Sequence, residues 1–214
     1  PPEGWPNYVL GSHDVPRMAS RVGEQQAAVA AMLLLTLRGT PTIYMGDEIG
    51  MVNGDIAPEQ IQDPQGLRLG AAHARDICRT PMQWDDSAYA GFSDAQPWLP
   101  VNADYTTRNV AAQQNDPTSM LSLHKRLLRL RKQSDALNVG DYRPLSAPEG
   151  VFAFVRNYGD DHKLVALNFT DQEHTIAVPD AGEIVLSTKL DREEHESGTV
   201  RLRPNEGVVV DLNS

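Results

Sequence analysis

The sequence has 214 residues, enough for one large domain or two small ones with a substantial buried core. Its 29 acidic residues outnumber its 19 Lys and Arg residues, and the formal charge of −10 argues against nucleic acid and anionic membranes as partners. No stretch approaches the ~20 apolar residues of a membrane span, and no signal peptide is visible. The single cysteine, Cys78, excludes an internal disulfide framework, and we predict a cytoplasmic location.

The short apolar run at residues 8–11 is followed at once by His13 and Asp14, and three residues later by Arg17. This pattern is typical of a buried strand that delivers polar groups to a pocket at its carboxyl end. A simpler interpretation is a turn before a helix, with Asp14 as the helix cap. These residues alone leave both interpretations open.

Residues 24–37 are rich in Ala, Leu and Met, and predict a helix that is buried on nearly every face of its second half. Gly39 ends this helix. Residues 41–45 then predict a second short buried strand, which runs into Asp47 and Glu48. A strand, a helix and a strand in this order predict a parallel pair, with both sets of acidic residues at one edge.

Residues 49–118 are rich in Gly, Pro, Asp, Asn and Gln and show little periodicity. A connection of this length is uncommon in a compact domain and is usually functional or disordered. Its Arg and Trp residues indicate an ordered loop. Trp84 and Trp98 are suited to stacking on sugar rings, although packing is the commoner role of a loop tryptophan.

Residues 120–133 give the clearest amphipathic helix, with Ser119 as its cap. The expected stripe contains Leu121, His124, Leu127 and Leu128. In an acidic protein the basic residues of this helix form a solvated face rather than a nucleic-acid surface.

Six short β-prone runs separated by turn-forming residues follow: 151–156, 163–169, 173–178, 183–188, 199–203 and 207–212. Their alternation predicts an antiparallel sandwich or small barrel. The charged run at 191–196 makes a weak metal site, because its carboxylates are nearly contiguous. We expect neither a metal nor a cofactor.

Three stretches resemble the α-amylase family of glycoside hydrolases, in its α-glucosidase and oligo-1,6-glucosidase branch. They are LGSHDVPRMASR at 10–21, RGTPTIYMGDEIGM at 38–51, and ARDICRTPMQWD at 74–85 with GFS at 91–93 and PWLPVN at 97–102. The resemblance covers the whole chain and is specific in its order and spacing. It implies an α/β plus all-β fold. Residues 1–140 would be the end of a (β/α)8 TIM barrel, with its last two strands and helices, and residues 141–214 a β-sandwich domain.

The resemblance also implies site residues. Asp14 corresponds to the third essential carboxylate, which holds two hydroxyls of the glucosyl ring at the reacting subsite and favours the charged transition state. His13 hydrogen-bonds a neighbouring hydroxyl, and Arg75 helps to close the pocket around the non-reducing glucose. Arg17 and Asp47 are assigned to substrate binding in a supporting role.

A retaining glycosidase also needs a nucleophile and an acid about 5–5.5 Å apart. In the family, both precede the Asp14 motif, as does the metal loop, and none of these stretches occurs in the 214 residues. Asp14 and Glu48 are disfavoured as a substitute pair, because Glu48 matches a position with no acid role. Ser12 stands where the family usually has Asn, which casts little doubt on Asp14.

We therefore expect part of a retaining α-glucosidase that removes terminal α-linked glucose from short oligosaccharides, and that is inactive as an isolated chain. Two strands cannot close a barrel. An N-terminal companion chain or an intertwined homo-oligomer is the expected partner, beside a small α-glucoside substrate. The alternative function is a non-catalytic scaffold or interaction module.

Overall fold

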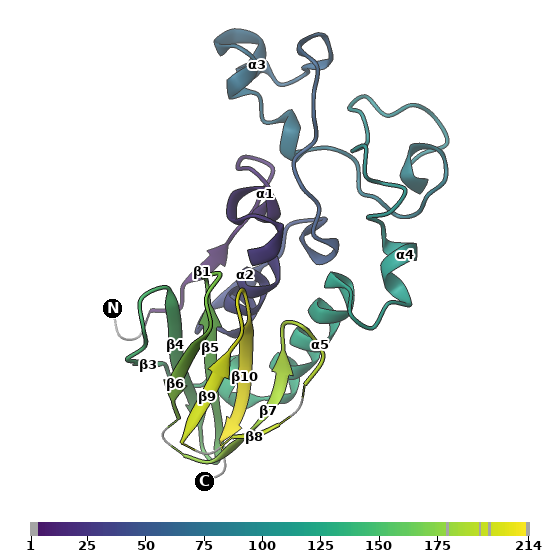
Figure 1. Cartoon of the computed structure of the whole chain (residues 1–214). Coiled ribbons are helices and arrows are strands. Elements are labelled where there is room, and N and C mark those ends of the chain that lie inside the picture. Colours follow the sequence, from purple (N-terminus) through teal and green to yellow (C-terminus); the bar gives the residue numbers. More distant parts are fainter. Residues whose placement is uncertain (1–3, 179, 193, 197, 213–214) are drawn as a thin grey trace. The chain divides into compact units, whose positions relative to one another are not determined.

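The computed structural model describes residues 4–178, 180–192, 194–196 and 198–212 (Figure 1). The chain forms two compact units. Unit 1 comprises Pro1–Tyr8, Gln25–Thr42 and Leu123–Ser214, and unit 2 comprises Val9–Glu24 and Ile43–Ser122. These compact units do not correspond to the expected domains, and the domain boundary after residue 140 stays a prediction. No helix within the described residues is long and apolar enough to cross a membrane.

Unit 1 contains the predicted antiparallel sheets. The larger sheet has the strand order β3 (Arg143–Leu145), β4 (Val151–Tyr158), β5 (Asp161–Asn168), β10 (Gly207–Leu212), β7 (Gly182–Ser187) and β8 (His195–Glu196). A second sheet pairs β6 (His174–Ala177) with β9 (Thr199–Leu202). All six predicted runs are strands. Strand β3, which contains Pro144, and the two-residue β8 were not predicted, because both are too short to show alternation.

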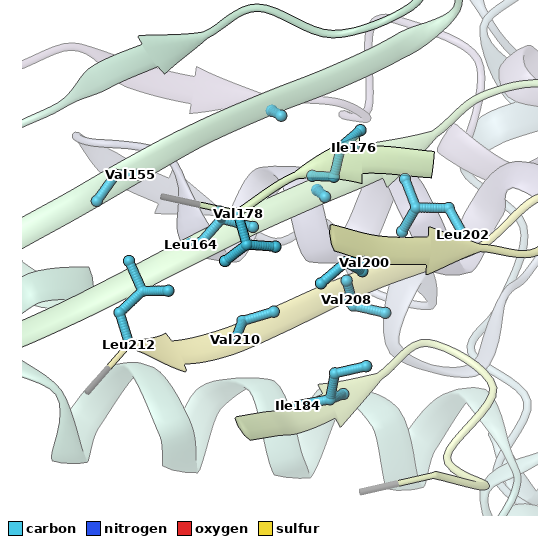
Figure 2. Packing of buried hydrophobic residues seen from close by; sticks show 12 residues of the cluster. Val155, Leu164, Ile176, Val178, Ile184, Val200, Leu202, Val208, Val210 and Leu212 are labelled. Carbon is cyan, nitrogen blue, oxygen red and sulfur yellow. The ribbon is translucent and has the colours of Figure 1, made fainter. Parts of the chain in front are cut away.

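The main apolar core of unit 1 lies between these two sheets (Figure 2). Strands β4 and β5 pair Val155 with Leu164, and β10 places Val210 beside Leu164, so one face collects apolar side chains. Ile176 from β6 and Val200 from β9 close this core from the second sheet. Burying each such side chain contributes about 1.5–3 kcal/mol.

Both faces of the central strands are buried, since successive residues of a strand point to opposite faces. Phe154 and Val165 lie on the face away from the core cluster and are fully buried. The helix α2 (Glu24–Thr36) packs on this side. Its residue Met32 lies against Gly207 of β10, so closely that a Cβ added to this glycine would be 2.9 Å from the methionine sulfur. The predicted burial of this helix is therefore confirmed.

The helices α5 (Met120–Gln133) and α6 (Asp135–Val139) follow in chain order. Helix α5 has the predicted bounds, and Ser119 accepts a hydrogen bond from the amide of Ser122, as expected of a cap. Leu127 is buried, but Leu128 is 45% exposed, so the expected apolar stripe is one position too wide.

Strands β1 (Asn7–Val9) and β2 (Thr40–Thr42) pair in a two-stranded sheet. The expectation that both are buried is wrong for the described chain, because each alternates exposed and half-buried residues. A sheet of two strands leaves much of its surface to solvent.

The helices that lie wholly within unit 2 are short. In chain order these are α1 (Met18–Val22), η1 (Asp47–Ile49), η2 (Pro58–Gln60), α3 (Pro64–Leu69), η3 (Ala71–His73), η4 (Asp76–Cys78), η5 (Ala88–Gly91) and α4 (Val110–Gln114). A small apolar cluster contains Ile49, Met51, Met82 and Leu121. Trp84 and Trp98 do not join it and are 50% and 70% exposed, so the expected packing role of loop tryptophans does not hold here.

Candidate active site

The turn after β1 presents His13 and Asp14. Ser12 and Val15 form an isolated antiparallel bridge across it, and the Asp14 amide donates to Ser12 Oγ at 3.1 Å. Helix α1 begins beyond this turn, with Arg17 as its N-cap residue and no side-chain cap hydrogen bond. Asp14 is therefore not a helix cap, and its carboxylate is available for other partners.

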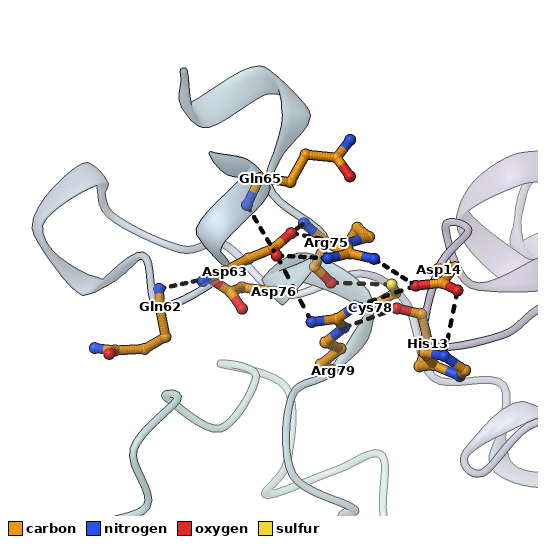
Figure 3. A network of polar contacts seen from close by, with 9 residues as sticks. All are labelled: His13, Asp14, Gln62, Asp63, Gln65, Arg75, Asp76, Cys78 and Arg79. Carbon is orange, nitrogen blue, oxygen red and sulfur yellow. Dashed lines mark hydrogen bonds and ion pairs between the residues drawn. The ribbon is translucent and has the colours of Figure 1, made fainter. Parts of the chain in front are cut away.

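Those partners come from a distant part of the sequence (Figure 3). Asp14 Oδ1 accepts hydrogen bonds from Arg75 Nη1 at 2.8 Å and from Arg79 Nη2 at 3.2 Å. Its Oδ2 lies 3.2 Å from Nε2 of His13. Arg79 Nε also donates to the His13 carbonyl at 2.8 Å. The structure thus brings His13, Asp14 and Arg75 together, and it adds Arg79.

Neighbouring side chains keep the Asp14 carboxylate ionised. Desolvation opposes ionisation, but the charge of His13 and the hydrogen bonds and charges of Arg75 and Arg79 lower the pKa of Asp14 below its ordinary value. The side chain remains 51% exposed. Asp14 is therefore a negative charge that neighbouring side chains orient and solvent can still reach.

Two buried carboxylates lie behind the arginines. Asp63 accepts three hydrogen bonds from Arg75, through its amide, Nε and Nη2, at 2.8–2.9 Å. Asp76 Oδ2 accepts from the amides of Gln62 and Asp63 at 2.7 and 2.9 Å. The pKa of Asp63 is well below its usual range, first because of the hydrogen bonds from the Arg75 side chain.

Sequence reasoning missed Asp63, Asp76 and Arg79. Arg79 and Asp76 lie inside the third stretch that resembles the family, so that motif was the available signal. Asp63 precedes Pro64 in a segment without periodicity, and nothing local distinguishes it from a turn or cap residue.

A cavity of about 370 Å³ opens beside this cluster. Its size falls in the range of pockets that hold small organic ligands. The cavity is lined by Asp14, Val15, Pro16, Gln65, Ala72, His73, Ala74, Arg75, Ile77 and Cys78. It therefore offers a carboxylate acceptor and a guanidinium donor to one bound molecule, which is a combination that suits hydroxyl groups.

Arg17 and Asp47 do not line this cavity. Arg17 is fully buried, donates to the carbonyls of Met45 at 2.6 Å and Thr80 at 3.2 Å, and covers the Tyr44 ring. Asp47 is 2% exposed and accepts from the Tyr44 amide at 3.2 Å. Burial raises the pKa of Asp47 to about 6, although that hydrogen bond and Arg17 oppose the shift. Both side chains form hydrogen bonds with backbone groups, and their supporting role in substrate binding stays a prediction.

Glu48 does not line the cavity beside Asp14. The Glu48 carboxylate accepts from the Gly46 amide at 2.8 Å and thereby stabilises its own turn. Among the described residues, no group of three or more His, Cys, Asp or Glu side chains is arranged to hold a metal ion. Glu193 lies outside the described residues, as do the side chains of His195 and Glu196.

Two stretches of the chain match known families. Residues 1–140 match the family described as alpha amylase, catalytic domain, and residues 151–209 match the alpha-amylase SusG C-terminal domain. The fold and the site thus define the class: a segment of a (β/α) catalytic domain followed by an antiparallel β-sheet C-terminal domain. The chain belongs to the α-amylase family.

Individual relatives are α-glucosidases. An oligo-1,6-glucosidase of Parageobacillus thermoglucosidasius is 34% identical over 238 aligned residues, which cover 97% of this chain and 42% of that protein. An alpha-glucosidase of Apis mellifera is 41% identical over 82% of this chain and 32% of its own length. The chain therefore spans about two fifths or less of the length of these relatives.

Solved structures agree with this comparison. A variant of the trehalose-6-phosphate hydrolase of Bacillus licheniformis superposes with a TM-score of 0.86 at 30% identity, over 99% of this chain and 44% of its own. A variant of the trehalulose synthase MutB in complex with glucose gives a TM-score of 0.84 at 32% identity, over 98% of this chain and 43% of that one. The predicted fold class is confirmed.

Proposed function

We propose that the chain supplies the glucosyl-binding wall of a retaining α-glucosidase active site. The observation that carries this proposal is the half-exposed Asp14 carboxylate, held by Arg75, Arg79 and His13 at the wall of a cavity. Relatives with the names oligo-1,6-glucosidase and alpha-glucosidase support the substrate class, which is terminal α-linked glucose of short oligosaccharides.

Each of the three site residues has a separate task. Asp14 accepts hydrogen bonds from two hydroxyls of the terminal glucose, and its charge favours the oxocarbenium-like transition state once substrate has displaced water. His13, whose side chain is 70% exposed, donates to a neighbouring hydroxyl. Arg75 forms the far wall and blocks extension beyond the non-reducing end, which makes the pocket exo-acting.

The nucleophile and the general acid come from outside these 214 residues in this proposal, because the stretches that carry them in the family are absent here. An N-terminal companion polypeptide is the expected source, with an intertwined homo-oligomer as the other arrangement. Native mass spectrometry of the purified sample identifies which assembly is present before any activity is measured.

The test is the substitution Asp14→Asn in the assembly that carries all three carboxylates, assayed with p-nitrophenyl α-glucoside. Because a transition-state charge is removed, we expect turnover to fall about 10²–10³-fold or more, with the circular dichroism spectrum unchanged and the unfolding midpoint only slightly lowered. Asp86→Asn removes an exposed carboxylate of the same unit and should retain full activity. An equal loss of folding and activity in Asp14→Asn would make Asp14 a structural residue instead.

A further inference from the structure

The side chain of Asp63 lies fully inside unit 2, yet it contacts the candidate site, chiefly through Arg75. Its two oxygens accept from the amide, Nε and Nη2 of Arg75, and one also accepts from the Gln65 amide at 3.2 Å. A helix cap needs only one of these contacts, the one from Gln65. The remaining hydrogen bonds exceed what the six-residue helix α3 requires.

This pairing fixes the plane of the Arg75 guanidinium. The Nε and Nη2 edge makes a two-point contact with the Asp63 carboxylate, the geometry in which arginine loses least freedom per hydrogen bond. Only the Nη1 side is left to face the cavity, and it donates to Asp14 at 2.8 Å. A lysine at position 75 has no second edge and could not be oriented in this way.

The backbone of Asp63 is itself fixed by a hydrogen bond to Asp76. The fully buried Asp76 accepts from the backbone amides of Gln62 and Asp63, so its carboxylate fixes the segment from which Asp63 projects. Arg79 strengthens the connection, because its Nη1 lies 3.9 Å from Asp63 Oδ1 while its Nη2 reaches Asp14. Contacts therefore run without a gap from Asp76 through Asp63 and the two arginines to Asp14 (Figure 3).

We propose that Asp63 is a positioning residue, which acts through Arg75 to orient Asp14 and to shape the cavity for terminal glucose. This inference rests on the proposed function for the identity of the ligand. Its geometric part, the orientation of Arg75 and Asp14, stands on the contacts of this chain alone. Asp63 does not touch the sugar and is not a catalytic residue.

The first test uses the unmodified chain. If Asp63 holds Arg75, the Nε–H proton of Arg75 should exchange with solvent at least about tenfold more slowly than that of Arg68, which is exposed in the same unit. Nitrogen-15 NMR of the arginine side chains measures both rates. Equal exchange rates for the two arginines would overturn the proposal without any variant having to fold.

The second test separates positioning from a simple charge effect. In Asp63→Asn the side chain keeps its size and an oxygen that can accept from Gln65. If Asp63 acts only as a nearby negative charge, its removal lowers the pKa of Asp14 further. If it positions Arg75, the Arg75 contact loosens, and the pKa of Asp14 rises toward its ordinary value. Carbon-13 NMR of the Asp14 carboxyl group across a pH titration gives the direction, and a fall or no change would contradict the proposal.

Glucose binding to the same chain completes the test. We expect D-glucose to bind Asp63→Asn about tenfold more weakly than the unmodified chain, since an oriented charged hydrogen bond is lost. Asp63→Glu, which restores the carboxylate on a longer arm, should recover part of this affinity, and Asp86→Asn should leave it unchanged. Unchanged affinity in a folded Asp63→Asn would overturn the role in glucose binding. If neither the unmodified chain nor its assembly with the companion polypeptide binds glucose, the proposed function fails, whereas the exchange rate and the Asp14 pKa still decide the role of Asp63.

Discussion

Charged side chains with buried partners have different roles in the two units. In unit 1, Arg156 is fully buried and donates to the carbonyls of Thr36, Leu137, Gly140 and Asp141, so its charge ties strand β4 to the helix ends. In unit 2, Arg75 gives one edge to a buried carboxylate and keeps the other at a cavity. The first arrangement closes a fold that apolar packing already defines, and the second orients a group that a ligand can use.

The apolar cores differ in the same sense. Among the described residues, 28 buried hydrophobic residues belong to unit 1 and 11 to unit 2. A small core specifies few positions, so unit 2 depends on hydrogen bonds and ion pairs for its shape. Polar networks of this kind are costly when one partner is removed, because the other is left unsatisfied. Unit 2 should therefore respond to changes in charge, and unit 1 to changes in side-chain volume.

The largest stability effect is expected in the core of unit 1. Leu164 is fully buried between the sheets, so Leu164→Ala removes contacts and leaves a cavity, which should lower the free energy of unfolding by about 2–5 kcal/mol. Urea denaturation followed by NMR signals of each unit measures this change. The signals of unit 2 within residues 43–122 should report no loss of their polar contacts.

The matched control is Leu128→Ala in the same unit. Leu128 is 45% exposed, and surface substitutions of this kind usually change stability by no more than about 0.5 kcal/mol. Similar costs for Leu164→Ala and Leu128→Ala would show that apolar packing does not dominate the stability of unit 1.

The next largest effect is a pH dependence in unit 2. The pKa of Asp47 is about 6 in the folded chain, above the ordinary 3.8, chiefly because of burial. Between these values the folded state holds more protons than the unfolded state, so stability from this group is present at low pH and is lost as pH rises through 6. The pKa difference corresponds to about 3 kcal/mol over the whole titration, of which about 2 kcal/mol falls between pH 4 and 7.

Asp47→Asn should remove that dependence, since the amide stays neutral. The stability of the variant minus that of the unmodified chain should therefore rise as pH increases from 4 to 7. The groups that face Asp47 (Arg17, Tyr44 and Glu48) are present in both proteins, so their own titration cancels to first order in the difference. Parallel pH curves for the two proteins would contradict the assignment of a raised pKa to Asp47.

The same contrast explains which parts of the structure the sequence could predict. Strands β4 and β5 and helix α5 carry apolar residues at fixed periods, and period determines which face of an element is buried. The site was predictable as far as a motif or resemblance reached, which brought in His13, Asp14 and Arg75. Asp63 was not, because its partner Arg75 is 12 residues away with no repeating element between them. Ion pairs across irregular loops have no sequence period.

The exposure of β1 and β2 was also beyond prediction from local sequence. Their apolar residues match those of a covered strand, and propensity does not say what lies on top of a strand. Likewise, loop tryptophans such as Trp84 and Trp98 are more often packed, but both are exposed in the described chain. Whether a residue is buried depends on its surroundings in the fold. Only in long elements does the period of apolar residues predict which positions are buried.

Helix caps should give a smaller effect that is equal in the two units. Ser134 accepts from the Leu137 amide at 3.2 Å in unit 1, and Asn109 accepts from the Ala112 amide at 2.7 Å in unit 2. Each substitution by Ala should lower the free energy of unfolding by about 1–2 kcal/mol, because one amide at a helix start loses its partner and a second hydrogen bond, to Asp161 or to the Tyr105 carbonyl, is also lost. Urea denaturation measures both. A cap that costs several times more in unit 2 would show that local contacts, rather than the wider network, distinguish the units.

The smallest effect is expected from an ion pair that resembles Arg75–Asp63 in chemistry and differs from it in setting. Arg201 Nη2 lies 2.5 Å from Glu173 Oε1, but both side chains are more than half exposed. Water and salt screen such a pair, and holding two long side chains in one geometry costs conformational entropy. Arg201→Ala, Glu173→Ala and the double variant should therefore unfold at nearly the same urea midpoint, and 1 M salt should not separate them. A double-mutant cycle measures the coupling between Arg201 and Glu173. A coupling as large as that between Arg75 and Asp63, measured in the same way, would show that burial does not decide the strength of these pairs, and that Asp63 has no special hold on Arg75.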